Sequence, residues 1–194
     1  MPSDIDLSWS AEAALDRLAA RYDEHLRLSG NSPAAHGRHI RRTGQTREAN
    51  AVVDMIAVTE AFSIDRLLAD WPSTAPDTIG TWRKREKAWL NVGADLTTTP
   101  SWLPLMGYVE VRNALQHGLG RLTAQQLERR NQTLSRVAAS GVDLNGDTVT
   151  LQADDVDRCY QTCRRFVHDA DSAAFHAIQL ALTSTTARHG VEQA

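Results

Sequence analysis

The longest regular pattern in the chain predicts a long helix close to its C-terminal end. From residue 156 onward, apolar residues recur at spacings of three and four positions: Val156, Tyr160, Cys163, Val167, Ala170, Ala174 and Ile178. Such spacing places them along one face of an α-helix, and Asp154 or Asp155 is positioned to cap its start. A helix of this length has to bury its apolar stripe, so the other elements are expected to pack around it.

The preceding segments have the same helical periodicity between breaks rich in glycine and proline. Helices are predicted at about 11–28, 46–70, 81–96, 102–117 and 123–139. The first should bury Leu15, Leu18, Tyr22 and Leu26, and the second Val53, Ile56, Ile64, Leu67 and Leu68. Residues 142–151 predict a β-hairpin that turns at Asn145-Gly146. The sequence therefore predicts an all-α, up-and-down helical bundle with a small β-hairpin before the last long helix.

Composition limits the classes of function. The 194 residues are expected to form a single domain, with 42% hydrophobic and 23% charged residues as in soluble globular proteins. A net charge of −3 argues against a protein that coats nucleic acid indiscriminately, so any RNA contact should be local. No secretory signal or membrane span is evident, which predicts a cytoplasmic protein without membrane contact. Cys159 and Cys163 lack a second ligand pair, so they are expected to be buried hydrophobes, with a redox switch as a remote alternative; no metal or cofactor is expected.

One segment is strongly basic. No acidic residue occurs from His25 to Arg47, and arginines accumulate there, including Arg38, Arg41 and Arg42. The segment at 29–47 could be a solvated loop. Alternatively, its arginines could bind RNA phosphates and guide the strand to a site elsewhere in the chain.

Near the middle of the chain, Arg112, Asn113 and His117 lie just before Gly118, which should end a helix. A guanidinium can bind phosphate oxygens bidentately and keeps its charge at any working pH, and an imidazole can give and take a proton near neutrality. The pair therefore suits chemistry on a phosphodiester. On an ideal helix Arg112 and His117 are about 140° apart, so they flank one face without stacking.

The spacing of Arg112, Asn113 and His117 resembles the R-N-x-x-x-H signature of the HEPN family, and the order of helices over about 45–180 is similar too. On this reading the helix at 11–28 and the basic loop are additions to the HEPN-like core. The resemblance implies a metal-independent endoribonuclease that leaves 2′,3′-cyclic phosphate ends. His117 would be the general acid or base, and Arg112 would neutralise the phosphate. Asn113 would orient one of them or donate a hydrogen bond to a phosphate oxygen.

The family resemblance also implies partners and an alternative. HEPN ribonucleases are homodimers whose motif helices meet at a two-fold axis, and many act in toxin–antitoxin or antiphage defence systems, so an antitoxin or a defence partner is expected. A toxin branch of the family has a tyrosine two positions after the histidine, where this chain has Leu119. Some HEPN domains are instead inactive nucleotide-binding, scaffold or dimerisation modules, and this alternative stays open.

Two further features bear on the site. Glu60 falls on the apolar stripe of the second helix, where an unpaired carboxylate is costly, and Arg112 is its candidate partner. Glu60 could equally be a rim residue with a local salt bridge. Trp82 and Trp89 alternate with the cations Arg83, Lys84, Arg85 and Lys87, so the tryptophans are either core anchors or platforms for RNA bases.

Overall fold

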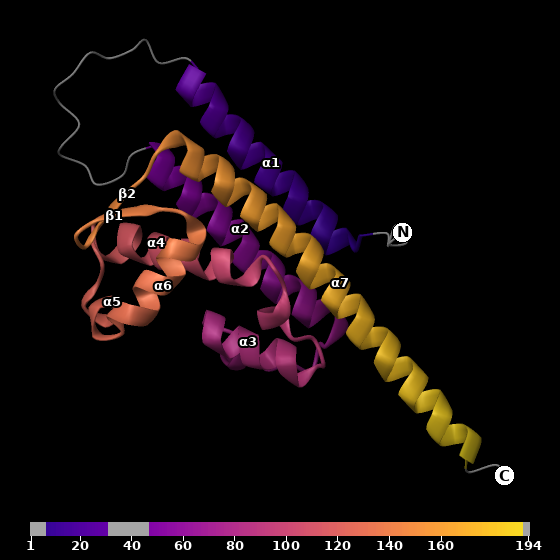
Figure 1. Ribbon diagram of the computed structural model, residues 1–194. Helices are drawn as coiled ribbons and strands as arrows, with labels where there is room; N and C mark the ends of the chain where they lie inside the picture. Colours follow the sequence, from indigo (N-terminus) through magenta and orange to yellow (C-terminus); the bar gives the residue numbers. More distant parts are fainter. Residues whose placement is uncertain (1–6, 31–46, 192–194) are drawn as a thin grey trace.

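The computed structural model describes residues 7–30 and 47–191, and most of these residues are helical (Figure 1). The prediction of an all-α bundle with a hairpin before the last long helix is confirmed. The helices and strands are α1 (Trp9–Gly30), α2 (Arg47–Asp70), α3 (Trp82–Asn91), α4 (Trp102–His117), α5 (Ala124–Glu128), α6 (Arg130–Ser140), β1 (Asp143–Asn145), β2 (Thr148–Thr150) and α7 (Ala153–Val191), with short 3-10 turns at Pro76–Thr78 and Leu96–Thr98.

Three long helices, α1, α2 and α7, lie side by side (Figure 1). The helix α1 runs antiparallel to α7, because Ser8 at its start bonds Asp171 whereas Tyr22 bonds Asp157. On the other side of α2, α4 packs between α2 and α6. The core is continuous through these contacts, and its largest fully buried side chains include Trp89, Tyr108, Phe62 and Phe166. The C-terminal part of α7 extends away from the bundle.

The buried face of α1 agrees with the prediction at Leu15, Leu18 and Tyr22 but not at Leu26. Leu18 is fully buried, but Leu26 is 48% exposed and His25 is buried in its place. The inner face begins with Ala11 and Ala14, whose small side chains give a weak hydrophobic signal in the sequence. On α2 the predicted stripe is confirmed, with Ile56 and Leu67 fully buried and the other three residues partly buried: Val53, Ile64 and Leu68.

Two predicted helix boundaries were wrong. The helix α3 ends at Asn91 rather than near Leu96, because Gly93 adopts a left-handed conformation with a φ of +90°. Leu96 is still buried, in the 3-10 turn that follows. The single helix predicted at 123–139 is divided into α5 and α6 at Arg129, which has the non-helical φ and ψ of −111° and 38°. The break redirects the chain so that α6 crosses α4.

The hairpin is confirmed, but its turn lies one residue later than predicted. Asn145 pairs with Thr148, so Gly146 and Asp147 form the loop. The first loop position has a φ of +63°, which glycine adopts without strain. Leu122 N donates to the carbonyl of Asp147 at 2.8 Å, which ties the segment after α4 to the hairpin.

The last helix begins at Ala153, so Asp154 and Asp155, one of which was predicted to cap it, lie inside its first turn. The carboxylate of Asp155 accepts the backbone N–H of Gln152 at 2.6 Å, and all of the predicted stripe is buried or partly buried. Cys159 and Cys163 are fully buried with their Sγ atoms 4.0 Å apart, which confirms them as core residues. Among the described residues, no helix combines the length and apolar character needed to cross a bilayer.

Candidate functional site

The motif residues lie in the last turns of α4, which ends where the sequence predicts. The backbone N–H groups of Gly118 and Gly120 both donate to the carbonyl of Ala114 at 3.0 Å. A Cβ on Gly118 would lie 1.8 Å from the carbonyl oxygen of Arg121, so only glycine fits this tight reversal. His117 is therefore held at the last position of the helix, next to Leu119, whose side chain is 83% exposed at a φ of 52°.

Arg112 pairs with Glu60, as the position of Glu60 on α2 predicted. Its Nη2 donates to Glu60 Oε1, and its Nη1 donates to Gln116 Oε1 at 3.2 Å. The side chains of Arg112 and Glu60 are 17% and 20% exposed, so the ion pair is largely shielded but still reaches solvent. Glu60 thus fixes the direction in which the guanidinium points.

Glu60 also binds a second arginine, which the sequence did not single out as a structural residue. Arg85 Nη2 donates to Glu60 Oε1 at 3.4 Å, and Nη1 donates to Ser63 Oγ at 3.2 Å. The Arg85 guanidinium stacks over the Trp82 ring, 4.3 Å from its centroid. Burial lowers the pKa of Arg85, although Glu60 opposes this effect. We refer to Arg85, Glu60 and Arg112 as the Glu60 triad.

The tryptophans are core residues. Trp89 is fully buried, and Trp82 packs edge-on against Trp102 and Phe166 with ring centroids 6.0 and 5.8 Å away. Among the described residues, neither tryptophan offers an open ring face for a nucleic-acid base, because Trp82 is covered by Arg85 and is only 9% exposed. Of the two interpretations of the α3 tryptophans, the core one is therefore confirmed.

A second carboxylate organises the opposite wall, and sequence reasoning missed it. Glu110 is 1% exposed, and it accepts hydrogen bonds from Arg136 Nη1 at 3.0 Å and Arg129 Nη2 at 3.2 Å. Gln126 Nε2 also donates to it, at 2.9 Å. We refer to Arg129, Glu110 and Arg136 as the Glu110 triad. The available signal was a carboxylate between Val109 and Val111, inside an otherwise apolar stretch of a helix.

Gly107 allows the Glu110 triad to form. A Cβ at this position would lie 2.2 Å from the backbone oxygen of Arg136 and 2.8 Å from the Ser140 Cβ. The absence of a side chain therefore lets α6 approach α4 closely. This approach brings Arg136 within reach of Glu110, one helical turn beyond Gly107.

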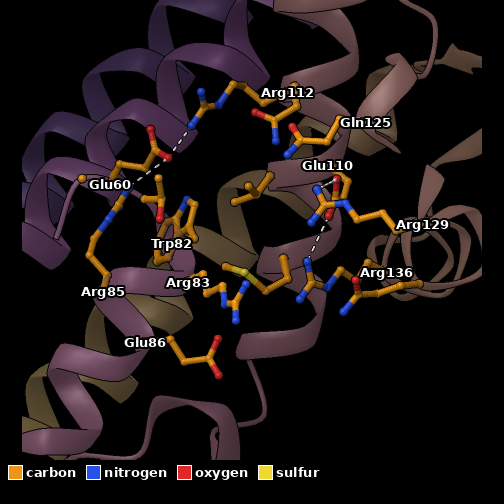
Figure 2. Close-up of a pocket in the computed structure, with 16 residues that line it drawn as sticks. Glu60, Trp82, Arg83, Arg85, Glu86, Glu110, Arg112, Gln125, Arg129 and Arg136 are labelled. Atoms are coloured by element: carbon orange, nitrogen blue, oxygen red, sulfur yellow. Dashed lines mark hydrogen bonds and ion pairs between the residues drawn. The ribbon is translucent and has the colours of Figure 1, made fainter. Parts of the chain in front are cut away.

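The two triads lie on opposite sides of a cavity of about 770 Å³ (Figure 2). The charged residues of its lining are five arginines and three glutamates, so the wall is cationic although the whole chain is acidic. Arg112 and Asn113 are neighbours on this wall. The lining comes from α2, α3, α4 and the α5–α6 region: Glu60, Gly80, Thr81, Trp82, Arg83, Arg85, Glu86, Met106, Val109, Glu110, Arg112, Asn113, Gln125, Arg129, Gln132 and Arg136.

His117 is not part of the cavity lining. Its side chain is exposed one helical turn beyond Asn113, on the same side of α4. Within residues 7–30 and 47–191, no hydrogen bond or ion pair holds the imidazole in one orientation. The structure thus brings Arg112, Asn113 and Glu60 together and leaves His117 at the edge of the group.

Three of the remaining predicted residues lie in a segment that the structure does not describe. Arg38, Arg41 and Arg42, assigned to RNA binding, lie outside the described residues. His168 and His176 are both exposed on the last helix. In the described part of the chain, no group of three or more His, Cys, Asp or Glu side chains is arranged to hold a metal ion.

In comparisons with known proteins, no family model, curated protein or solved structure matches this chain significantly. The site is therefore defined by its own residues: the buried carboxylate of Glu110 and the partly buried carboxylate of Glu60, each holding two arginines on the wall of one cavity.

Proposed function

We propose that this protein is a metal-independent endoribonuclease of the HEPN type, acting on cytoplasmic RNA. The observation that carries the proposal is the position of Arg112 and Asn113, side by side on the wall of a cationic cavity, with Arg112 oriented by Glu60. An oriented guanidinium in a partly shielded site stabilises phosphate charge more strongly than one in open water. The R-N-x-x-x-H spacing places a histidine at the edge of the same surface.

The proposed reaction is attack of a ribose 2′-oxygen on the adjacent phosphorus. The new P–O bond closes a 2′,3′-cyclic phosphate, and the bond to the 5′-oxygen of the next nucleotide breaks. One group must take the proton of the 2′-hydroxyl, and another must give a proton to the departing 5′-oxygen. Arg112 would neutralise the phosphate as charge builds in the pentacoordinate transition state, and Asn113 would donate a hydrogen bond to a phosphate oxygen or orient a neighbour.

Each chain supplies one motif histidine, whereas the reaction needs two proton transfers. His117 is exposed at the end of α4, so a second copy of the chain related by a two-fold axis could bring its own His117 to the same phosphate. Leu119, which is also exposed beside it, could contribute apolar area to such a contact. The proposal therefore includes a homodimer with the ends of α4 at its axis.

A biological role in toxin–antitoxin or antiphage defence forms part of the proposal and rests on the resemblance to HEPN proteins alone. An antitoxin or defence partner would then restrain the activity. Leu119 cannot accept a modification that requires a tyrosine hydroxyl, so restraint by that route is not available to this chain.

A second candidate is a non-catalytic module that binds nucleotides or other proteins. Two observations favour it: Arg112 already has a carboxylate partner, and His117 does not line the cavity. In such a module Arg112 would stabilise the fold through its ion pair with Glu60, and His117 would be an ordinary surface residue.

The test is cleavage of a mixed RNA pool by the purified full chain in the presence of a chelator. Arg112→Ala and His117→Ala are the test variants, and Arg130→Ala and His168→Ala are matched controls, because both residues are exposed and lie outside the cavity lining. The proposal expects cyclic phosphate ends with wild type and both controls, and at least about a hundredfold loss in each test variant. Folded, dimeric wild type that cuts no RNA, or equal cutting by His117→Ala, would favour the non-catalytic module.

A further inference from the structure

We infer that the Glu110 triad binds a second backbone phosphate of the RNA strand whose scissile phosphate lies at Arg112. This inference rests on the proposed function for the identity of the strand, but its physical basis is the opposite wall of the cavity. Arg129 and Arg136 have no part in the R-N-x-x-x-H motif, and the structure places both on the cavity lining.

The first argument is charge. Glu110 is buried and shares its single negative charge between two guanidiniums, which leaves the Glu110 triad with a net charge of +1. One arginine would have been enough to neutralise the carboxylate. The second arginine therefore leaves an excess positive charge on the wall, as Arg85 and Arg112 do at Glu60.

The second argument is accessibility. The side chains of Arg129 and Arg136 are 40% and 25% exposed, whereas the Glu110 side chain is only 2% exposed. A ligand in the cavity therefore meets the guanidiniums and not the carboxylate. Each guanidinium carries five N–H donors and directs one nitrogen to Glu110, so donors remain for phosphate oxygens.

The third argument is position. Glu110 and Arg112 are two residues apart on α4, which places them about 200° apart around the helix. The two triads thus flank α4, and Figure 2 shows them on opposite sides of the cavity. From the diameter of a helix with its side chains, their separation is on the order of 10 Å. Phosphates about one or two nucleotides apart on an extended strand suit this separation. The cavity of about 770 Å³ is also within the usual range for ligand sites.

The probe is a fluorescent 2′-O-methyl RNA of about eight nucleotides, which lacks the attacking hydroxyl and reports binding without cleavage. The variants are Arg129→Gln and Arg136→Lys, the second of which keeps a cation for Glu110 but loses the planar fork. Arg130→Gln is the matched control, because Arg130 pairs with Asp147 and lies outside this cavity. Thermal unfolding of each variant shows that the protein compared is folded.

We expect Arg129→Gln and Arg136→Lys each to bind the probe about five- to tenfold more weakly than wild type, and Arg130→Gln to bind within about twofold of wild type. Arg129→Gln should also lower the slope of log affinity against log salt by about 0.7, the value for one lost phosphate contact on a single strand. Probes with one uncharged methylphosphonate locate the contact: wild type should be sensitive at two positions, and Arg129→Gln should lose sensitivity at only one.

The inference is overturned if folded triad variants bind like wild type, if they lose no position-specific sensitivity, or if wild type does not bind the probe at low salt. Failure of the proposed function is a separate result. If wild type binds the probe through Arg129 and Arg136 but cuts no RNA, the phosphate site stands and the nuclease does not. If wild type cuts RNA and the triad variants keep its kcat and KM, the nuclease stands and the second phosphate site does not.

Discussion

Glu110→Gln removes one charge from the most buried acid of the cavity wall and keeps the shape of the side chain. Glu110 is 1% exposed and accepts hydrogen bonds from Arg129, Arg136 and Gln126. After the substitution, two guanidiniums face each other without a counter-charge. The amide also offers only one oxygen where the carboxylate offered two.

The expected loss of stability follows from these contacts. A hydrogen bond to a charged group contributes about 1.5–3 kcal/mol, so the two arginine contacts together set an upper limit of about 3–6 kcal/mol. The exposure of Arg129 and Arg136, 40% and 25%, lets their charged ends turn toward water, which reduces this penalty. We therefore expect a loss of about 2–4 kcal/mol, equivalent to a fall in Tm of roughly 5–15 °C for a chain of this length.

Urea unfolding followed by circular dichroism measures this loss as a lower midpoint with an unchanged m value. Glu128→Gln is the control, since Glu128 is an exposed acid on α5, and it should change the free energy of unfolding by less than about 0.5 kcal/mol. A loss below about 1 kcal/mol for Glu110→Gln would refute the reasoning, because the arginines would then not depend on this carboxylate for their position.

Three further predictions concern other parts of the fold. Gly107→Ala should lower the free energy of unfolding by about 1–3 kcal/mol, because its Cβ would lie 2.2 Å from a backbone oxygen of α6; Gly80→Ala, with nothing within 4 Å, should not. The hydrogen bond to Asp157 raises the pKa of Tyr22 to about 12, so its stabilisation is complete below the unfolded tyrosine pKa of about 10 and is lost as pH rises through about 12. Urea unfolding should accordingly show the penalty of Tyr22→Phe shrinking over that interval. Burial raises the pKa of Cys159, so a thiol reagent near pH 8 should label it only after unfolding, as mass spectrometry can show.

The helices were predictable wherever many residues repeat one pattern. The apolar stripe of α7 spans several turns, so its prediction as a helix does not depend on any single residue. The same holds for α2 and α4. The errors arose where a single residue or a single tertiary contact determines where a helix ends. Gly93 ends α3 early by adopting a positive φ, and Arg129 breaks the helix predicted at 123–139. Neither position differs from a helix interior in hydrophobic pattern, so periodicity could not have located the breaks.

About half of the site could be predicted from the sequence. Glu60 could be identified from the sequence as a carboxylate on an apolar stripe, and its candidate partner Arg112 is the residue that it binds. The same logic applies to Glu110, but its partners are 19 and 26 residues further along the chain. Identifying them requires the crossing of α6 over Gly107, which local sequence does not encode. The position of His117 outside the cavity depends on where α5 and α6 lie, and it too follows only from the tertiary structure.

The two triads explain how an acidic chain can carry a cationic cavity. A cluster of unpaired arginines would repel one another and stay mobile, whereas a carboxylate held between two of them cancels part of the repulsion and fixes both. Each triad keeps a charge of +1 at the cavity, while acids elsewhere bring the whole chain to −3. Because the guanidiniums are already ordered, a phosphate that binds them loses little side-chain entropy. Such a phosphate must share each guanidinium with its glutamate, so no single contact is strong, and firm binding requires a ligand that reaches both triads at once.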